Sequence, residues 1–208
     1  EREDPLDAFV SNTYACFDEL PQGAKVGTSS LRRKCQILKQ RPDLNIIDLR
    51  GNVGTRLSKL DAGLYDAIIL ASAGLKRLGL NGRIRHTLDA TLSLPAVGQG
   101  ALGLECRETD QAVLDLILPL LHVESDLCVR AERAFNAYLE GGCQVPIAGY
   151  ATLHQDQIQI EGRVGSFDGA TLLKVKLSGP AEDAQQLGIT LAQKLLEQGA
   201  GDLLKSFY

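Results

Sequence analysis

The 208-residue sequence has no methionine and no tryptophan, and its five cysteines form no Cys-x-x-Cys pair. An odd set of cysteines without a histidine at metal-ligand spacing indicates neither a disulfide framework nor a zinc site. No apolar run approaches the roughly 18 residues that span a bilayer, and the charged start from Glu1 to Pro5 is unlike a signal peptide. We therefore expect a globular cytoplasmic protein with no membrane partner and no metal. The missing initiator methionine indicates a fragment of a longer chain.

Positive charge is scarce overall but concentrated in one segment. The chain has a net charge of −4, whereas residues 25–59 hold nine Lys or Arg against two acids, a local charge of +7. Such a basic segment in an acidic protein indicates a localised anion site rather than a basic surface. Nucleic-acid binding is the weakest interpretation, because the segment has no aromatic side chain for base stacking.

The first arginine pair stands where a strand passes into a helix. Leu31, Cys35 and Leu38 recur at helical spacing until Pro42, which places Arg32 and Arg33 in the first turn. Cations at a helix start are unfavourable for stability alone, whereas anions bind there. The pattern therefore predicts a bound carboxylate or phosphate at this turn, with ordinary solvated arginines as the alternative. Three small polar residues precede the helix: Thr28, Ser29 and Ser30.

Two later turns repeat this arrangement. Arg50 and Arg56 flank the turn after a short strand at residues 46–49, and Arg77 lies near the start of a helix that follows the apolar run 65–70. Three alternations of strand and helix predict an α/β domain with a mainly parallel sheet, whose ligands bind beyond the carboxyl ends of its strands. We expect all these arginines at one cleft, although exposure on a helix is an equal alternative for Arg77.

Three further residues are candidates outside the basic segment. Gln99 is the polar side chain of a glycine-rich apolar segment, and Arg133 lies on a predicted helix over residues 125–139, where it faces either solvent or the cleft. Cys143 follows Gly141-Gly142 in a loop that can present a thiol, although most free cysteines are small buried hydrophobes. The rest of the chain predicts three antiparallel strands and a helix over residues 181–197, a small α+β domain.

Four motifs together resemble one enzyme family. GTSSLRR at residues 27–33, LRGNVGTRLSKL at 49–60, SLPAVGQGA at 93–101 and EGGCQVP at 140–146 are similar to porphobilinogen deaminase, also called hydroxymethylbilane synthase. The resemblance covers essentially the whole chain. It implies a monomeric transferase of porphyrin and heme biosynthesis that joins four porphobilinogen units into hydroxymethylbilane and releases ammonia.

The resemblance also implies a three-part division. Residues 1–93 match a periplasmic-binding-protein-like βαβ domain, residues 94–121 a segment returning to a first domain, and residues 122–208 the C-terminal α+β domain. The family's first domain, with a catalytic aspartate in a Lys-Asp-Val-Pro stretch, is expected to precede Glu1. On this interpretation the catalytic residue lies outside the given sequence, and the fragment is inactive alone.

The resemblance finally implies site residues. A dipyrromethane cofactor, two linked porphobilinogen units, is expected on Cys143 through a thioether. Cofactor contacts are implied for Thr28, Ser29, Ser30, Arg32, Arg33, Arg50 and Arg56, and substrate contacts for Arg77, Gln99 and Arg133. A non-enzymatic module that binds a small acid reversibly is the alternative from another class, because a βαβ domain with anion-binding helix starts serves both.

Overall fold

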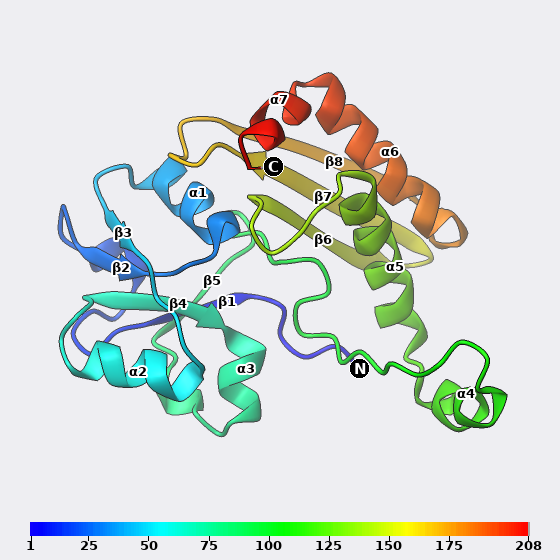
Figure 1. The fold of residues 1–208 in the computed structure, drawn as a ribbon, viewed down its shortest axis with the longest axis horizontal. Helices are drawn as coiled ribbons and strands as arrows, with labels where there is room; N and C mark the ends of the chain where they lie inside the picture. The colour runs from blue at the N-terminus through cyan, green and yellow to red at the C-terminus, as the bar shows by residue number, and fades with distance from the viewer. Residues whose placement is uncertain (208) are drawn as a thin grey trace.

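A computed structural model describes residues 1–207 as two lobes (Figure 1). The first lobe holds a five-stranded sheet and the second a three-stranded sheet. The first sheet comprises β1 Asp7–Val10, β2 Lys25–Gly27, β3 Asn45–Ile47, β4 Ala67–Ala71 and β5 His86–Leu88. Its helices are α1 Leu31–Gln40, α2 Val53–Asp61 and α3 Ser72–Arg77.

The first sheet has the strand order β3-β2-β4-β1-β5. Strand β2 is parallel to β3 and to β4, whereas β1 is antiparallel to both of its neighbours. Four strands therefore share one direction, which confirms the predicted α/β class with a mainly parallel sheet. The insertion of β1 between β4 and β5 was not predicted, because strands of three or four residues carry too little periodicity to be paired from sequence.

Both faces of this sheet are covered, as its apolar strands require. In β4, Ile69 points into a cluster with Phe9 and Ile37 of α1. Its neighbour Ile68 points to the opposite face, where Leu57 of α2 completes a second cluster. The helices thus lie on opposite faces, with α1 on the side of the second lobe (Figure 1).

The second lobe packs two long helices on one face of an antiparallel sheet. The strands are β6 Ile147–His154, β7 Gln157–Gly165 and β8 Leu172–Pro180. The helices are α5 Val123–Tyr138 and α6 Ala184–Glu197, followed by the short α7 Ala200–Leu204. Phe135 is fully buried at the centre, and glycines at positions 149 and 162 leave space for its ring. This arrangement confirms the predicted α+β unit. Tyr138, the last residue of α5, is 45% exposed.

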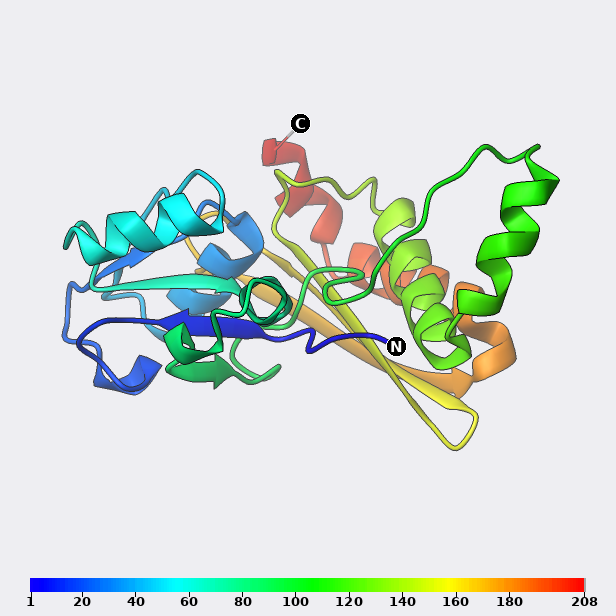
Figure 2. The same cartoon turned by 90° about the horizontal axis from the view of Figure 1, so that it is seen from below.

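The segment 102–121 connects the two lobes in the sequence. It extends away from the body of the molecule and carries α4 Gln111–Ile117 (Figure 2). Its leucines are largely exposed, and Leu116 reaches 75%. In the described part of the chain, no helix combines the length and the apolar character needed to cross a bilayer.

The lobes contact each other through α1 and β7. Arg163 of β7 is buried and donates to the Gln36 Oε1 on α1 at 2.8 Å and to the Ala90 carbonyl at 2.7 Å. Gly165 approaches α1 so closely that a Cβ there would lie 2.6 Å from the Cys35 Sγ. Helix α1 is therefore shared by both lobes.

Phe135→Ala should destabilise the second lobe by about 3–5 kcal/mol, because it removes a fully buried ring and leaves a cavity. The matched control is Phe167→Ala, whose ring is 56% exposed and contacts the Lys34 ammonium; it should cost about 1 kcal/mol or less. Urea unfolding followed by circular dichroism measures both. Equal losses would contradict this account of the core.

Candidate functional site

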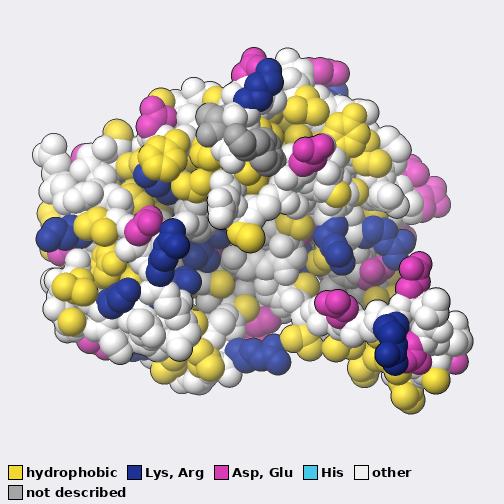
Figure 3. Space-filling model, viewed as in Figure 1, with side chains coloured by type: hydrophobic (Ala, Val, Ile, Leu, Met, Phe, Trp, Pro, Cys, Tyr) yellow, Lys and Arg dark blue, Asp and Glu magenta, His cyan; other side chains and the backbone are white. Residues whose placement is uncertain are grey.

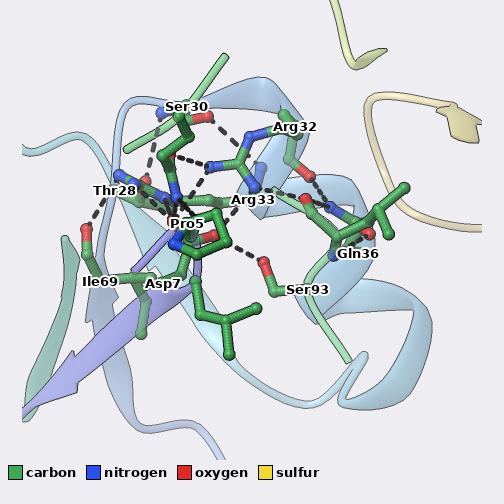
Figure 4. Close-up of polar contacts among 12 residues, drawn as sticks. Pro5, Asp7, Thr28, Ser30, Arg32, Arg33, Gln36, Ile69 and Ser93 are labelled. Atoms are coloured by element: carbon green, nitrogen blue, oxygen red, sulfur yellow. Dashed lines mark hydrogen bonds and ion pairs between the residues drawn. The ribbon is translucent and has the colours of Figure 1, made fainter. Parts of the chain in front are cut away.

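A buried carboxylate lies at the centre of the first arginine turn (Figure 4). Asp7, the first residue of β1, is fully buried. The Arg32 Nη1 donates to its Oδ2 at 2.8 Å, and the Arg33 Nη2 donates to its Oδ1 at 2.7 Å. Arg32 Nη2 and Arg33 Nε add two further bonds to Oδ1. We had expected a bound anion to offset the repulsion between these arginines, and in the structure Asp7 does so.

The two arginines differ in the donors that they keep. Each terminal nitrogen of Arg32 donates two hydrogen bonds. Nη1 donates to Asp7 and to the Leu94 carbonyl, and Nη2 donates to Asp7 and to the Gln99 Oε1. Arg33 uses Nε and one N–H of Nη2 on Asp7 and one N–H of Nη1 on the Ile69 carbonyl. A guanidinium has five N–H donors, so within residues 1–207 Arg33 retains two without a partner.

The three hydroxyl residues hold the backbone around this turn. Ser30 is the N-cap of α1, and its hydroxyl accepts from the Arg33 amide. The Ser29 hydroxyl accepts from the Leu49 amide at 2.9 Å and joins the first turn to the second, while Thr28 accepts from the Ser30 amide. Each hydroxyl still has its own proton to donate to a ligand.

Gln99 joins the same cluster from a distant part of the chain. Its Nε2 donates to the Asp7 Oδ1 at 3.0 Å and to the Pro5 carbonyl, and its Oε1 accepts from Arg32 at 3.4 Å. The side chain thus serves the arginine pair through Asp7.

The second turn is more open. Asn52 caps α2 and accepts from the Thr55 amide at 2.8 Å. Arg56 lies in the first helical turn, half-buried, and its Nε donates to the Gly51 carbonyl at 2.8 Å. Arg50 precedes the cap, with a side chain 83% exposed and a long 3.9 Å pair to Asp48. Lys and Arg side chains gather on both sides of the hollow between the lobes (Figure 3).

Arg77 and Arg133 lie apart from this cluster. Helix α3 begins at Ser72, directly after β4, so Arg77 is its exposed last residue rather than a residue of its first turn. The predicted helix start was wrong because the chain enters the helix without a spacer, and a cation at a helix end is favourable by itself. Arg133 is exposed on α5.

Cys143 is exposed in the loop between α5 and β6. Strand β6, which this loop enters, contacts α1, so the thiol loop and the arginine helix lie on the same side of the molecule (Figure 1). Burial raises the pKa of the Cys35 thiol to about 12 and that of Cys128 to about 11, which makes both poor nucleophiles at neutral pH. An exposed thiol and an arginine with open donors are features that a covalently attached, carboxylate-bearing cofactor requires.

Asp7, Arg32 and Arg33 form a buried trio of charged groups, and burial affects the pKa values of its members. Burial alone would raise the pKa of Asp7, but the charges of Arg32 and Arg33 and their hydrogen bonds hold it well below its usual range. Burial lowers the pKa of Arg33, and the positive charges of Arg32 and Arg56 lower it further. The Asp7 carboxylate acts in the opposite direction and raises it. The guanidinium nonetheless stays protonated at physiological pH. The trio therefore carries a net charge of +1.

Sequence reasoning missed Asp7, although it is the residue that organises the site. It also missed Ser93, whose hydroxyl donates to the Asp7 Oδ2 at 2.8 Å. The available signal was an aspartate among apolar residues in a short strand, because buried carboxylates are found paired with cations.

Two protein-family models match the chain. The model described as "Porphobilinogen deaminase, dipyromethane cofactor binding domain" matches residues 1–115, which include both arginine turns. The model described as "Porphobilinogen deaminase, C-terminal domain" matches residues 126–197, which include Cys143.

The lowered pKa of Asp7 predicts a specific loss of stability in acid. A carboxylate whose folded pKa lies below its unfolded value near 3.9 stabilises the fold above that pH and loses its contribution as pH falls. The free energy of unfolding should therefore fall more steeply in the wild type than in Asp7→Asn between about pH 5 and pH 2. At pH 7 the variant should be less stable by about 3–5 kcal/mol.

Urea unfolding at a series of pH values measures both effects. Asp202→Asn, which removes an exposed carboxylate paired with Lys205, is the control and should keep the wild-type pH dependence. Parallel pH curves for the wild type and Asp7→Asn would contradict the role of the buried trio.

Proposed function

Because the chain belongs to the porphobilinogen deaminase family, we propose that its residues serve the joining of four porphobilinogen units into hydroxymethylbilane with release of ammonia. The family is a transferase family of tetrapyrrole biosynthesis that acts on porphobilinogen, and residues 1–115 match the model of its dipyrromethane cofactor binding domain. The observation that carries the proposal is the pair of capped helix starts, where Arg33 and Arg56 lie close enough for their charges to interact.

In this proposal the cofactor is attached to Cys143 through a thioether. When bound, the cofactor supplies the pyrrole end to which further units are joined. The exposure of the thiol and the small residues before it support this attachment, since neither hinders the approach of a flat pyrrole.

The cofactor carboxylates are bound by the two turns. Arg33 supplies N–H donors without a partner among the described residues, and Arg50 and Arg56 add more exposed guanidiniums suited to bidentate contacts. Arg32 contributes charge, and the hydroxyls of Thr28, Ser29 and Ser30 can each donate one hydrogen bond. The exposed Arg77 and Arg133 are proposed to contact the incoming substrate, and Gln99 is proposed to assist its binding through the Asp7 cluster that its side chain joins.

We also propose that the chain is divided into residues 1–93, 94–121 and 122–208. Support comes from the apolar clusters of the two lobes, which include no residue of the segment 102–121. The leucines of that segment are exposed at Leu102, Leu104, Leu116, Leu118, Leu120 and Leu121.

Protein purified from cells that make porphobilinogen should be heavier than its sequence by two pyrrole units. Cys143→Ser should have the unmodified mass, whereas Cys16→Ser, which alters a partly exposed cysteine of the first lobe, should keep the added mass. Intact mass spectrometry with Ehrlich's reagent measures the outcome. Wild-type protein of unmodified mass that gives no colour would exclude the proposed attachment.

The proposed division predicts that charges are tolerated in the middle segment. Leu116→Glu with Leu120→Glu should change the free energy of unfolding by about 0.5 kcal/mol or less, because both side chains are exposed. Leu195→Glu, at a fully buried position, should prevent folding of the C-terminal lobe. A loss above about 2 kcal/mol in the double variant would place the segment within a lobe core.

A further inference from the structure

We propose that Asp7 is a positioning residue that holds Arg32 as an anchor and leaves Arg33 as the arginine of this turn that binds a ligand carboxylate. The inference rests on the proposed function and assigns different tasks to two arginines that the sequence presents as equivalent (Figure 4).

Arg32 is an anchor because the protein itself uses its terminal nitrogens. Its Nη1 bonds to Asp7 and to the Leu94 carbonyl at 2.6 Å, and its Nη2 bonds to Asp7 and Gln99. The Leu94 carbonyl is held in turn by the Gln36 Nε2 at 3.2 Å, and Gln36 is held by Arg163 of the second lobe. A ligand that took these donors would leave buried carbonyl and carboxylate oxygens unpaired, at a cost in free energy.

Arg33 is positioned for a different task. The Arg33 Nε and Nη2 donate to Asp7, and one N–H of Nη1 donates to the Ile69 carbonyl. One N–H on each terminal nitrogen keeps no partner among residues 1–207, and Arg56 adds positive potential nearby. Two fixed donors on one guanidinium match the two oxygens of a carboxylate.

Asp7 does not have to move away from Arg33 for a ligand carboxylate to bind. Its two oxygens accept six hydrogen bonds, from Arg32, Arg33, Ser93 and Gln99, and it has no exposed surface. Moving Asp7 would leave the buried guanidiniums of Arg32 and Arg33 to repel each other. It would also leave the Ser93 and Gln99 donors without their hydrogen bonds to Asp7. With Asp7 in place the trio keeps a charge of +1, which one carboxylate balances.

The test measures reversible binding of porphobilinogen, the unit from which the cofactor is built, by isothermal titration calorimetry. Every variant is made in a Cys143→Ser background, so that no covalent cofactor occupies the position that the arginine turns bind. Asp7→Asn should raise Kd about 10-fold to 100-fold, the range expected when a charge-assisted hydrogen bond is lost. Arg33→Gln should have a similar effect. Combining Asp7→Asn with Arg33→Gln should raise Kd no further than Arg33→Gln alone, because Asp7 acts through Arg33.

Phe135→Ala is the control for a merely structural effect. Phe135 is fully buried in the core cluster of the C-terminal lobe, which includes none of Asp7, Arg32, Arg33 and Gln99. This variant should lose comparable stability and keep Kd within about twofold. If Asp7→Asn does not fold, Asp7→Asn with Arg32→Gln removes one cation along with the carboxylate, and weakened binding is again expected.

Three results would overturn the inference. The first is binding as tight or tighter in Asp7→Asn, or in its double variant with Arg32→Gln. The second is additive losses in the combination with Arg33→Gln, and the third is an equal rise of Kd in Phe135→Ala. If the background protein does not bind porphobilinogen and the wild type carries no adduct, the proposed function fails as well. If binding and adduct are present and Asp7→Asn binds normally, the inference fails alone.

Discussion

The structure of the site depends on one carboxylate shared by two guanidiniums. Charges taken out of water are costly unless they are paired and fully hydrogen-bonded, and Asp7 meets this condition for Arg32 and Arg33. Strand β1, which carries Asp7, occupies an interior position in an otherwise parallel sheet. Pairing β1 with β4 places Asp7 opposite Ala71, at the edge where α1 begins. The carboxylate therefore determines where the cations of α1 can lie.

A second buried carboxylate joins the C-terminal lobe to the same network. Glu132 of α5 accepts from Arg2 and from the amides of Gly98 and Ala151. Arg2 in turn donates to the Gln99 carbonyl, so the two chain segments that pass between the lobes are tied to each other and to the C-terminal sheet. The contact of Arg163 of β7 with Gln36 of α1 adds a further tie between the lobes. The lobe that carries both arginine turns is thereby held against the lobe whose sheet follows the loop of Cys143.

The charge distribution matches an acidic ligand in a protein that is itself acidic. The +7 of residues 25–59 is set against a net charge of −4, so the positive potential is confined to one region. Within it the guanidinium of the buried Arg33 is fixed by Asp7 and the Ile69 carbonyl, whereas the side chain of Arg50 is exposed. The region therefore combines a guanidinium held by the protein with one that is open to solvent.

The sequence by itself determined the α/β class, the helix start at Arg32 and Arg33, and the loop at Cys143, because helical periodicity, proline and glycine act locally. It also identified the family through four motifs. Only the tertiary structure decided that both terminal nitrogens of Arg32 are fully used while those of Arg33 are not, and that Asp7 joins these two arginines. Those outcomes depend on contacts between residues 25 to 92 positions apart, formed when β1 enters the sheet. A periodic pattern describes which face of an element is buried, whereas the partner of a buried charge is set by three-dimensional packing.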